Sequence, residues 1–246
     1  MSQRSQAPSR ARVELMHWTA RIGAVTAEAL ALRVESTPTA ARARLRSAER
    51  EGLLTRWRLL SAEPALYTVT RSGMKASGLR GLDPVRVSAT NARHLSTCAW
   101  VAAALERCYP DHLLMGEREL RRDERERGTA LASASVGTRP DGGRALHRPD
   151  LVLWPASVDE ALPVAVEVEL SIKAPQRLAA ICQAWARCRC VAGVLYLVTA
   201  EVQPALERAI EVSAAGEQIV VVGLDAVPGT ATAAQRPLGR SVPGDA

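Results

Sequence analysis

The chain of 246 residues contains no phenylalanine, and aromatic residues make up only 3% of it. Alanine and arginine are abundant instead, which indicates a codon bias rather than a function. No apolar run approaches the roughly 18–20 residues of a membrane span, and no apolar signal-peptide segment follows the basic N-terminus. These absences argue against a membrane partner, and we expect a cytoplasmic protein.

Cysteine is scarce, and no two of the five cysteines form a C-x-x-C pair. Their number is odd, and the spacing of Cys182, Cys188 and Cys190 does not favour a zinc site in the absence of nearby histidines. We therefore expect reduced and mostly buried thiols rather than a disulfide framework. The five cysteines are Cys98, Cys108, Cys182, Cys188 and Cys190.

Positive charge is concentrated in the first part of the chain. Residues 1–93 contain 16 Lys and Arg against 7 Asp and Glu, a net charge of +9, whereas the remainder carries −3. Nearly all of this positive charge is arginine, whose forked guanidinium suits phosphate and guanine. Nucleic acid is therefore the leading class of partner. The length and the hydrophobic content of 47% suffice for two modest domains.

Three helices followed by two strands are predicted between residues 12 and 78. Thr26 and Thr37 are suitable N-caps, and Pro38 fits the first position of a helix. The third helix places Ala41 and Leu45 inward, and its arginines lie on other faces. The predicted helices span residues 13–25, 26–34 and 39–51, and the two strands begin at residues 53 and 66.

The sequence Glu51-Gly52-Leu53-Leu54, the hairpin and the later Tyr67-Thr68-Val69-Thr70-x-x-Gly73 resemble winged helix-turn-helix domains. This resemblance covers about residues 12–78 and implies that the third helix enters the major groove of double-stranded DNA. The alternative is a solvated arginine surface on a domain that binds protein. The DNA-binding residues that the resemblance implies are Arg42, Arg44, Arg46 and Arg50 on the helix and Arg56, Arg58 and Arg71 on the wing.

A second domain is predicted over residues 94–226, after a winged helix at 10–80 and a linker at 81–93. We expect residues 128–143 to form a mobile loop and residues 227–246 to be disordered. The predicted helices of this domain span residues 95–108, 116–127, 175–190 and 204–214. The predicted strands span residues 113–115, 151–154, 164–173, 194–198 and 218–223.

Two glutamates occupy a strand that is otherwise apolar. Because side chains alternate in an extended chain, Glu167, Glu169 and Lys173 share one face, and valines occupy the other. The apolar residues around Glu167 indicate an interior strand, where clustered carboxylates need a partner such as a divalent cation. The alternative is a solvated strand face. Asp150, which opens the apolar run of residues 151–154, would be the third acid, or else a simple turn residue.

The motif Pro149-Asp150 followed by Glu167-x-Glu169 resembles the PD-(D/E)xK nuclease superfamily, although Glu169 stands where the superfamily has lysine. The predicted order of helix, strand, strand, strand, helix and strand is also the core order of that superfamily. The resemblance implies Mg²⁺ or Mn²⁺ bound by Asp150, Glu167 and Glu117. It implies catalytic roles for Asp150, Glu167, Glu169 and Lys173. The fold class is thus α/β (α+β): a winged helix-turn-helix followed by a restriction-endonuclease-like αβββαβ domain.

The whole arrangement is similar to the replication-relaxation family of plasmids and conjugative elements. The similarity includes His94, Glu117-Arg-Glu119-Leu-Arg121, Arg148-Pro149-Asp150, the Glu167 strand and Val194-Leu-Tyr196. It implies a DNA-handling protein of a mobile element, and a homodimer is compatible because winged helices commonly dimerise. Two functions remain open. One is a metal-dependent DNA endonuclease or nicking factor, and the other is a sequence-specific regulator of replication, transfer or transcription with an inactive nuclease-like domain.

Overall fold

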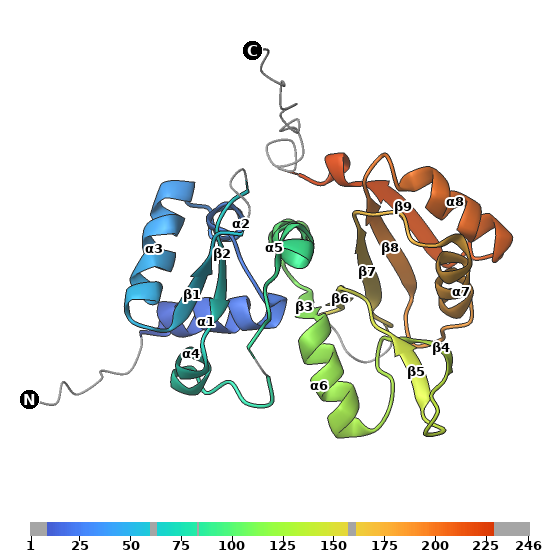
Figure 1. Ribbon diagram of the computed structural model, residues 1–246, viewed down its shortest axis with the longest axis horizontal. Coiled ribbons are helices and arrows are strands. Elements are labelled where there is room, and N and C mark those ends of the chain that lie inside the picture. The colour runs from blue at the N-terminus through green and yellow to red at the C-terminus, as the bar shows by residue number, and fades with distance from the viewer. Residues whose placement is uncertain (1–8, 60–62, 83, 157–160, 229–246) are drawn as a thin grey trace, which may run out of the picture.

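The computed structural model describes residues 9–59, 63–82, 84–156 and 161–228, and its architecture is mixed α/β (Figure 1). Residues 229–246 of the predicted tail lie outside the described residues. Among the helices in the described ranges, none is long and apolar enough to cross a bilayer. All five cysteines are free, and Cys108 is the exposed one among them.

The first part of the chain consists of three helices, a hairpin and a short fourth helix. Thr26 accepts a hydrogen bond from the Ala29 N–H and Thr37 accepts one from the Ala40 N–H, so both predicted N-caps are confirmed. The elements are α1 (Arg10–Ile22), α2 (Ala27–Arg33), α3 (Pro38–Arg50), β1 (Leu54–Trp57), β2 (Leu66–Val69) and α4 (Arg71–Ala76).

The hairpin β1–β2 is extended by the segment between α1 and α2. Val25 and Tyr67 exchange two backbone hydrogen bonds, at 3.0 and 2.8 Å. Ala41, Leu45 and Ala48 of α3 are fully buried, as predicted, because they lie on one face of the helix. The hairpin and α3 are thereby fixed against the same small core.

The second part of the chain is built around a five-stranded sheet in the order β3-β6-β7-β8-β9. Pairing is antiparallel from β3 to β7 and parallel from β7 to β9. The elements are α5 (Ala89–Cys108), β3 (Leu113–Gly116), α6 (Glu117–Arg127), β4 (Ala134–Thr138), β5 (Arg144–His147), β6 (Leu151–Trp154), β7 (Val164–Glu169), α7 (Pro175–Ala186), β8 (Gly193–Val198), α8 (Gln203–Val212), β9 (Ile219–Gly223) and the 3-10 turn η1 (Leu224–Ala226).

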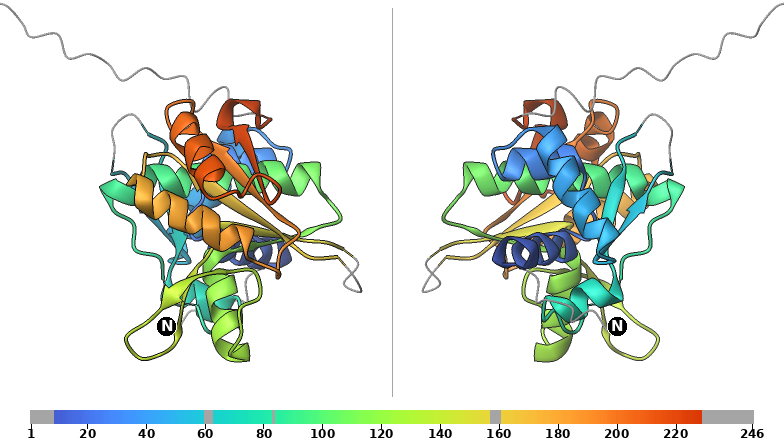
Figure 2. Two further views of the ribbon diagram at one scale, coloured as in Figure 1. Left: turned by 90° about the vertical axis from the view of Figure 1, so that its right-hand side faces the viewer. Right: turned by 90° about the vertical axis from the view of Figure 1, so that its left-hand side faces the viewer.

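Helices cover both faces of the sheet. In Figure 1, α5 lies between the N-terminal helices and the sheet, while α7 and α8 cover the opposite face. The two views of Figure 2 show these layers from either side. Val166 and Val168 belong to the core shared with α5, and Ala165 belongs to the core around Trp185 of α7. The prediction that β7 is an interior strand is therefore confirmed.

The two parts of the chain share one hydrophobic core. It includes Leu15 and Trp18 of α1 as well as Val101 of α5. Gly116, at the junction of β3 and α6, lies so close to α1 that an added Cβ would stand 2.1 Å from the Arg21 carbonyl oxygen. An ion pair of 3.0 Å between Arg21 Nε and Glu119 Oε2 joins the same two elements. The N-terminal helices are thus docked on α5 and the start of α6.

Several predicted boundaries were wrong; for example, α7 ends at Ala186 and not at residue 190. Helix α5 begins at Ala89, inside the predicted linker, because the Asn91 side chain accepts a hydrogen bond from the Ser88 N–H and starts the helix early. The predicted loop at 128–143 contains strand β4, which pairs with β5. Strand β7 ends at Glu169 instead of continuing to residue 173, because its partner β8 ends at Val198.

Candidate functional site

Four of the predicted DNA-binding arginines line one open hollow. Arg42 and Arg46 lie on the exposed face of α3. Arg56 lies in β1, and Arg58 directly follows that strand. The hollow has a volume of about 620 Å³ and is also lined by Glu28 and Glu63, among other residues. The helix and the hairpin together therefore gather guanidinium groups around a single concave surface.

The other three arginines do not line this hollow. Arg44 and Arg50 are exposed elsewhere on α3. Arg71 is the first residue of α4, capped by Thr70, and was predicted on the wing. It lies with Lys75 and Arg80 along a second open hollow. This second group of basic residues is separate from the one between α3 and β1.

Two of the four arginines in the first hollow form ion pairs within the chain. Arg42 Nη2 lies 3.2 Å from Glu28 Oε1, and Arg56 Nε lies 3.4 Å from Glu49 Oε1. The side chains of Arg42 and Glu28 remain 46% and 36% exposed. Ion pairs with this exposure contribute little to stability, so a phosphate can replace the carboxylates at small cost.

Arg12 is a positioning residue that sequence reasoning missed. Its guanidinium donates to the Arg44 carbonyl at 3.0 Å, to Ser47 Oγ at 3.1 Å and to Glu51 Oε1 at 2.7 Å. These contacts fix α1 to the C-terminal half of α3. Because they join residues more than 30 positions apart, no local pattern in the sequence indicates them.

The predicted acidic residues lie at one end of the sheet. Asp150 directly precedes β6, whose first residue pairs with Val166 of β7. The Asp150 carbonyl accepts a hydrogen bond of 3.0 Å from the Glu117 N–H, at the start of α6. Glu167 and Glu169 are both buried near the end of β7. The topology thus brings these three segments together, although they are distant in the sequence.

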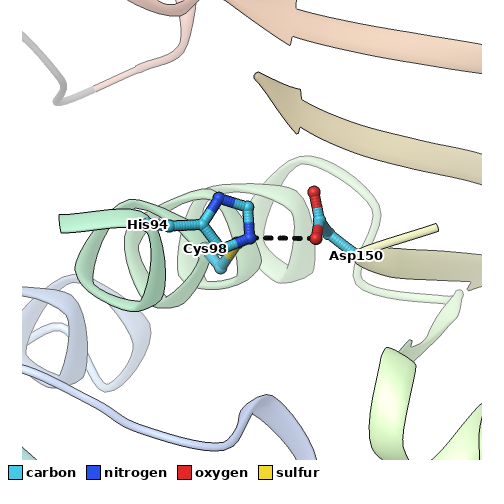
Figure 3. Close-up of side chains that lie close together, drawn as sticks. All are labelled: His94, Cys98 and Asp150. Atoms are coloured by element: carbon cyan, nitrogen blue, oxygen red, sulfur yellow. Dashed lines mark hydrogen bonds and ion pairs between the residues drawn. The ribbon is translucent and has the colours of Figure 1, made fainter. Parts of the chain in front are cut away.

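Both carboxylate oxygens of Asp150 have partners. Oδ2 accepts a hydrogen bond of 2.8 Å from the Val168 N–H, and Oδ1 lies 2.9 Å from His94 Nε2 of α5. Figure 3 shows this contact, with Cys98 beside the imidazole ring. The hydrogen bond to Asp150 raises the pKa of His94 above its usual value, against the opposing effect of burial.

Glu167 is held by two donors from different elements. Its Oε1 lies 2.7 Å from His147 Nε2, at the end of β5, and accepts a hydrogen bond of 3.3 Å from Trp185 Nε1 of α7. Burial raises the pKa of Glu167, and the hydrogen bond from His147 opposes that shift. His147 therefore compensates part of the cost of burying this carboxylate.

Lys173 does return to the acidic residues, although β7 has ended. Its ammonium forms an ion pair with the carboxylate of Glu169, four residues earlier in the sequence. Burial lowers the pKa of Lys173, while the negative charges of Glu167 and Asp150 oppose the shift. Lys173, Asp150 and Glu167 thus influence one another electrostatically, which gives the end of the sheet a mixed-charge cluster.

Glu117 is directed to a different partner. Its carboxylate forms an ion pair with Arg121 on the exposed side of α6. Within the described residues, the one group of three or more potential metal ligands whose ligand atoms lie within 4.8 Å of one another is His94, Cys98 and Asp150. The structure therefore does not bring Asp150, Glu167 and Glu117 into a common ligand set.

Sequence reasoning did not assign roles to Cys98, His147 and Trp185, and it named His94 only as part of the similarity to the replication-relaxation family. The spacing of four residues between His94 and Cys98 places both on one helical face, which was a usable signal. No comparable signal existed for His147, which pairs with a residue 20 positions later.

Comparison of the chain with family models, with curated proteins and with solved structures finds no match.

Proposed function

We propose that the chain binds double-stranded DNA through α3 and the β1–β2 hairpin, which act as a winged helix-turn-helix. The bridge between Val25 and Tyr67 supports this proposal, because it adds a third extended segment to the hairpin. In the same proposal, the order α5, β3, β6, β7, α7, β8 is a nuclease-like αβββαβ core, in keeping with the resemblance to plasmid and conjugative-element proteins.

The observation that carries the proposal is the hollow lined by Arg42, Arg46, Arg56 and Arg58. Arginines from two elements converge there, as is needed to contact the phosphates on both sides of a groove. The guanidinium groups also suit bidentate contacts with guanine, which gives the surface a means of reading sequence. The resulting function is a regulator of replication, transfer or transcription that binds a specific DNA site.

The salt dependence of DNA binding tests this proposal. Each arginine that neutralises a phosphate contributes about −0.9 to the slope of log K against log salt concentration. Four such contacts predict a slope of roughly −3 to −4, measured by fluorescence anisotropy of a labelled duplex. A slope near zero would show that the arginine hollow is not the DNA surface. A palindromic preferred site would support the predicted homodimer.

DNA cleavage is the second candidate function. The observation in its favour is the cluster of Asp150, Glu167 and Lys173 at the end of the sheet. However, Mg²⁺ prefers oxygen ligands in an octahedral arrangement, whereas the potential ligands grouped with Asp150 are a nitrogen of His94 and the sulfur of Cys98. Glu167 Oε1 is hydrogen-bonded to His147 and Trp185 instead. Glu169, at the usual lysine position, is itself paired with Lys173. As placed, the residues do not fit a magnesium site.

We therefore expect supercoiled plasmid to stay intact when it is incubated with the protein and Mg²⁺ or Mn²⁺. The measurement is agarose electrophoresis of the plasmid over time, with the Asp150→Ala variant in parallel. Nicking by the wild-type protein that disappears in Asp150→Ala would establish the nuclease and overturn this expectation. Equal nicking by both proteins would instead identify a contaminating nuclease.

A further inference from the structure

Two side chains of α5 that can act as metal ligands lie close to Asp150. His94 and Cys98 are four residues apart and project from the same face of the helix (Figure 3). Cys98 Sγ lies 3.4 Å from His94 Nε2, and Asp150 Oδ1 lies 2.9 Å from the same nitrogen. One imidazole nitrogen is therefore approached by a sulfur and by a carboxylate oxygen at once.

A single proton on His94 Nε2 forms a strong hydrogen bond with only one of its two neighbours. If His94 Nε2 carries a proton, it donates that proton to Asp150 and has no lone pair left for the Cys98 thiol. If Nε2 is unprotonated, it can accept from the thiol, but it then faces an ionised carboxylate without a proton between them. A cation in the position of the proton would interact with all three groups at once, because a thiolate, an imidazole nitrogen and a carboxylate all donate electron pairs to it.

Two of the three separations between the ligand atoms are close to those expected around a tetrahedral metal ion. Ligand atoms at about 2.0–2.3 Å from zinc are roughly 3.3–3.5 Å apart when the angles at the metal are tetrahedral. The separation of 3.4 Å between Sγ and Nε2 already has this value, and the separation of 2.9 Å between Nε2 and Oδ1 is shorter by only a few tenths of an ångström. All three ligand atoms lie within 4.8 Å of one another.

We propose that His94, Cys98 and Asp150 bind one transition-metal ion of the zinc class. The mixed nitrogen, sulfur and oxygen donor set is suited to Zn²⁺ or Co²⁺, whereas Mg²⁺ selects oxygen ligands. On binding, the Cys98 thiol releases its proton to solvent and the sulfur coordinates as thiolate. His94 coordinates through Nε2 and keeps its remaining proton on Nδ1.

The surroundings orient the ligands and leave one side open. The Val168 N–H holds Asp150 Oδ2 at 2.8 Å, which turns Oδ1 toward His94. Cys98 is buried, but the His94 side chain is 38% exposed and that of Asp150 is 20% exposed. Three protein ligands with access to solvent leave the fourth tetrahedral position for water or for a small anionic ligand.

The site is independent of DNA binding, because the arginine hollow lies on α3 and β1. It does share Asp150 with the predicted nuclease site. A bound transition metal therefore occupies a carboxylate that a magnesium-dependent mechanism would need.

Metal titration of the untagged full-length protein tests the proposal. We expect chelator-treated protein to bind one Co²⁺ per chain, with a near-ultraviolet thiolate-to-cobalt charge-transfer band that Zn²⁺ abolishes. Zn²⁺ at 100 times its Kd is expected to raise Tm by about 5–11 °C, whereas Mg²⁺ at the same concentration has no such effect. Failure of wild-type protein to bind Co²⁺ would overturn the proposal.

Matched variants localise the site. Cys98→Ser is expected to abolish the charge-transfer band, while Cys108→Ser, at the exposed end of the same helix, is expected to retain it. His94→Gln replaces a partly exposed ligand and is expected to weaken Co²⁺ binding at least tenfold without loss of the fold in circular dichroism. An unchanged band in Cys98→Ser, or unchanged affinity in folded His94→Gln, would overturn the assignment. Duplex binding is expected to be equal in all three variants.

Discussion

The double variant Arg42→Ala/Arg46→Ala is expected to bind duplex DNA about 10- to 100-fold more weakly than the wild type. Both side chains lie on the exposed face of α3 and line the same hollow. Loss of two phosphate contacts is expected to make the slope of log K against log salt concentration shallower by about 2 units. Fluorescence anisotropy with one labelled duplex at several salt concentrations measures both quantities.

The matched control is Arg125→Ala/Arg127→Ala. It removes the same charge from exposed positions near the end of α6, outside the arginine hollow. The control is expected to retain a slope close to that of the wild type, because long-range charge has little effect beyond a Debye length of about 10 Å. Equal losses of affinity and slope in the two double variants would show that binding depends on net charge alone, not on the surface of α3.

Local signals in the sequence were sufficient to predict the first three helices and the β1–β2 hairpin, although helix α4 was not predicted. Thr37 and Pro38 set the start of α3 through groups within the first turn, and Ala41 and Leu45 show its buried face. The central strand β7 was also predictable, because residues covered on both faces of a sheet form a nearly continuous apolar run. The contacts that determine the start of α3 lie within a few residues of one another in the sequence. For β7, the burial of apolar residues is enough to indicate the strand.

Other elements depend on tertiary contacts that a single sequence does not display. Strand β4 lies in a segment rich in Ala, Ser and Gly, and it becomes a strand by pairing with β5 and by contact of Ala134 with the core around α7. The early start of α5 likewise depends on the side chain of Asn91. The shared core between α1 and α5 joins segments about 80 residues apart, so the predicted linker gave no indication of it.

The acids of the candidate site could be predicted, but their partners could not. An acid on a buried strand is visible in the sequence as a charge within an apolar run, as at Glu167. The identity of its donors depends on which loops and helices fold over that strand. His147 and Trp185 reach Glu167 from β5 and α7, which tertiary packing brings beside β7. Nothing in the sequence indicated that an imidazole and an indole N–H would contact Glu167.

His147→Ala is therefore expected to lower the free energy of unfolding by about 3 kcal/mol. The substitution leaves the Glu167 carboxylate, whose side chain is 8% exposed, with the single weaker hydrogen bond from Trp185. A buried carboxylate that loses its main partner keeps its desolvation cost without compensation. Urea unfolding at pH 7, followed by circular dichroism, measures the change, and His112→Ala serves as a control for the loss of a half-buried imidazole.

A double-mutant cycle with Glu167→Gln separates charge from packing. Glutamine preserves the shape of the side chain but has no charge to compensate, so His147→Ala is expected to cost only about 1 kcal/mol in that background. The difference of about 2 kcal/mol is the coupling energy between the imidazole and the carboxylate. If His147→Ala costs the same with glutamate as with glutamine at position 167, then His147 stabilises the fold by packing against Trp185, whose ring centroid lies 5.8 Å away.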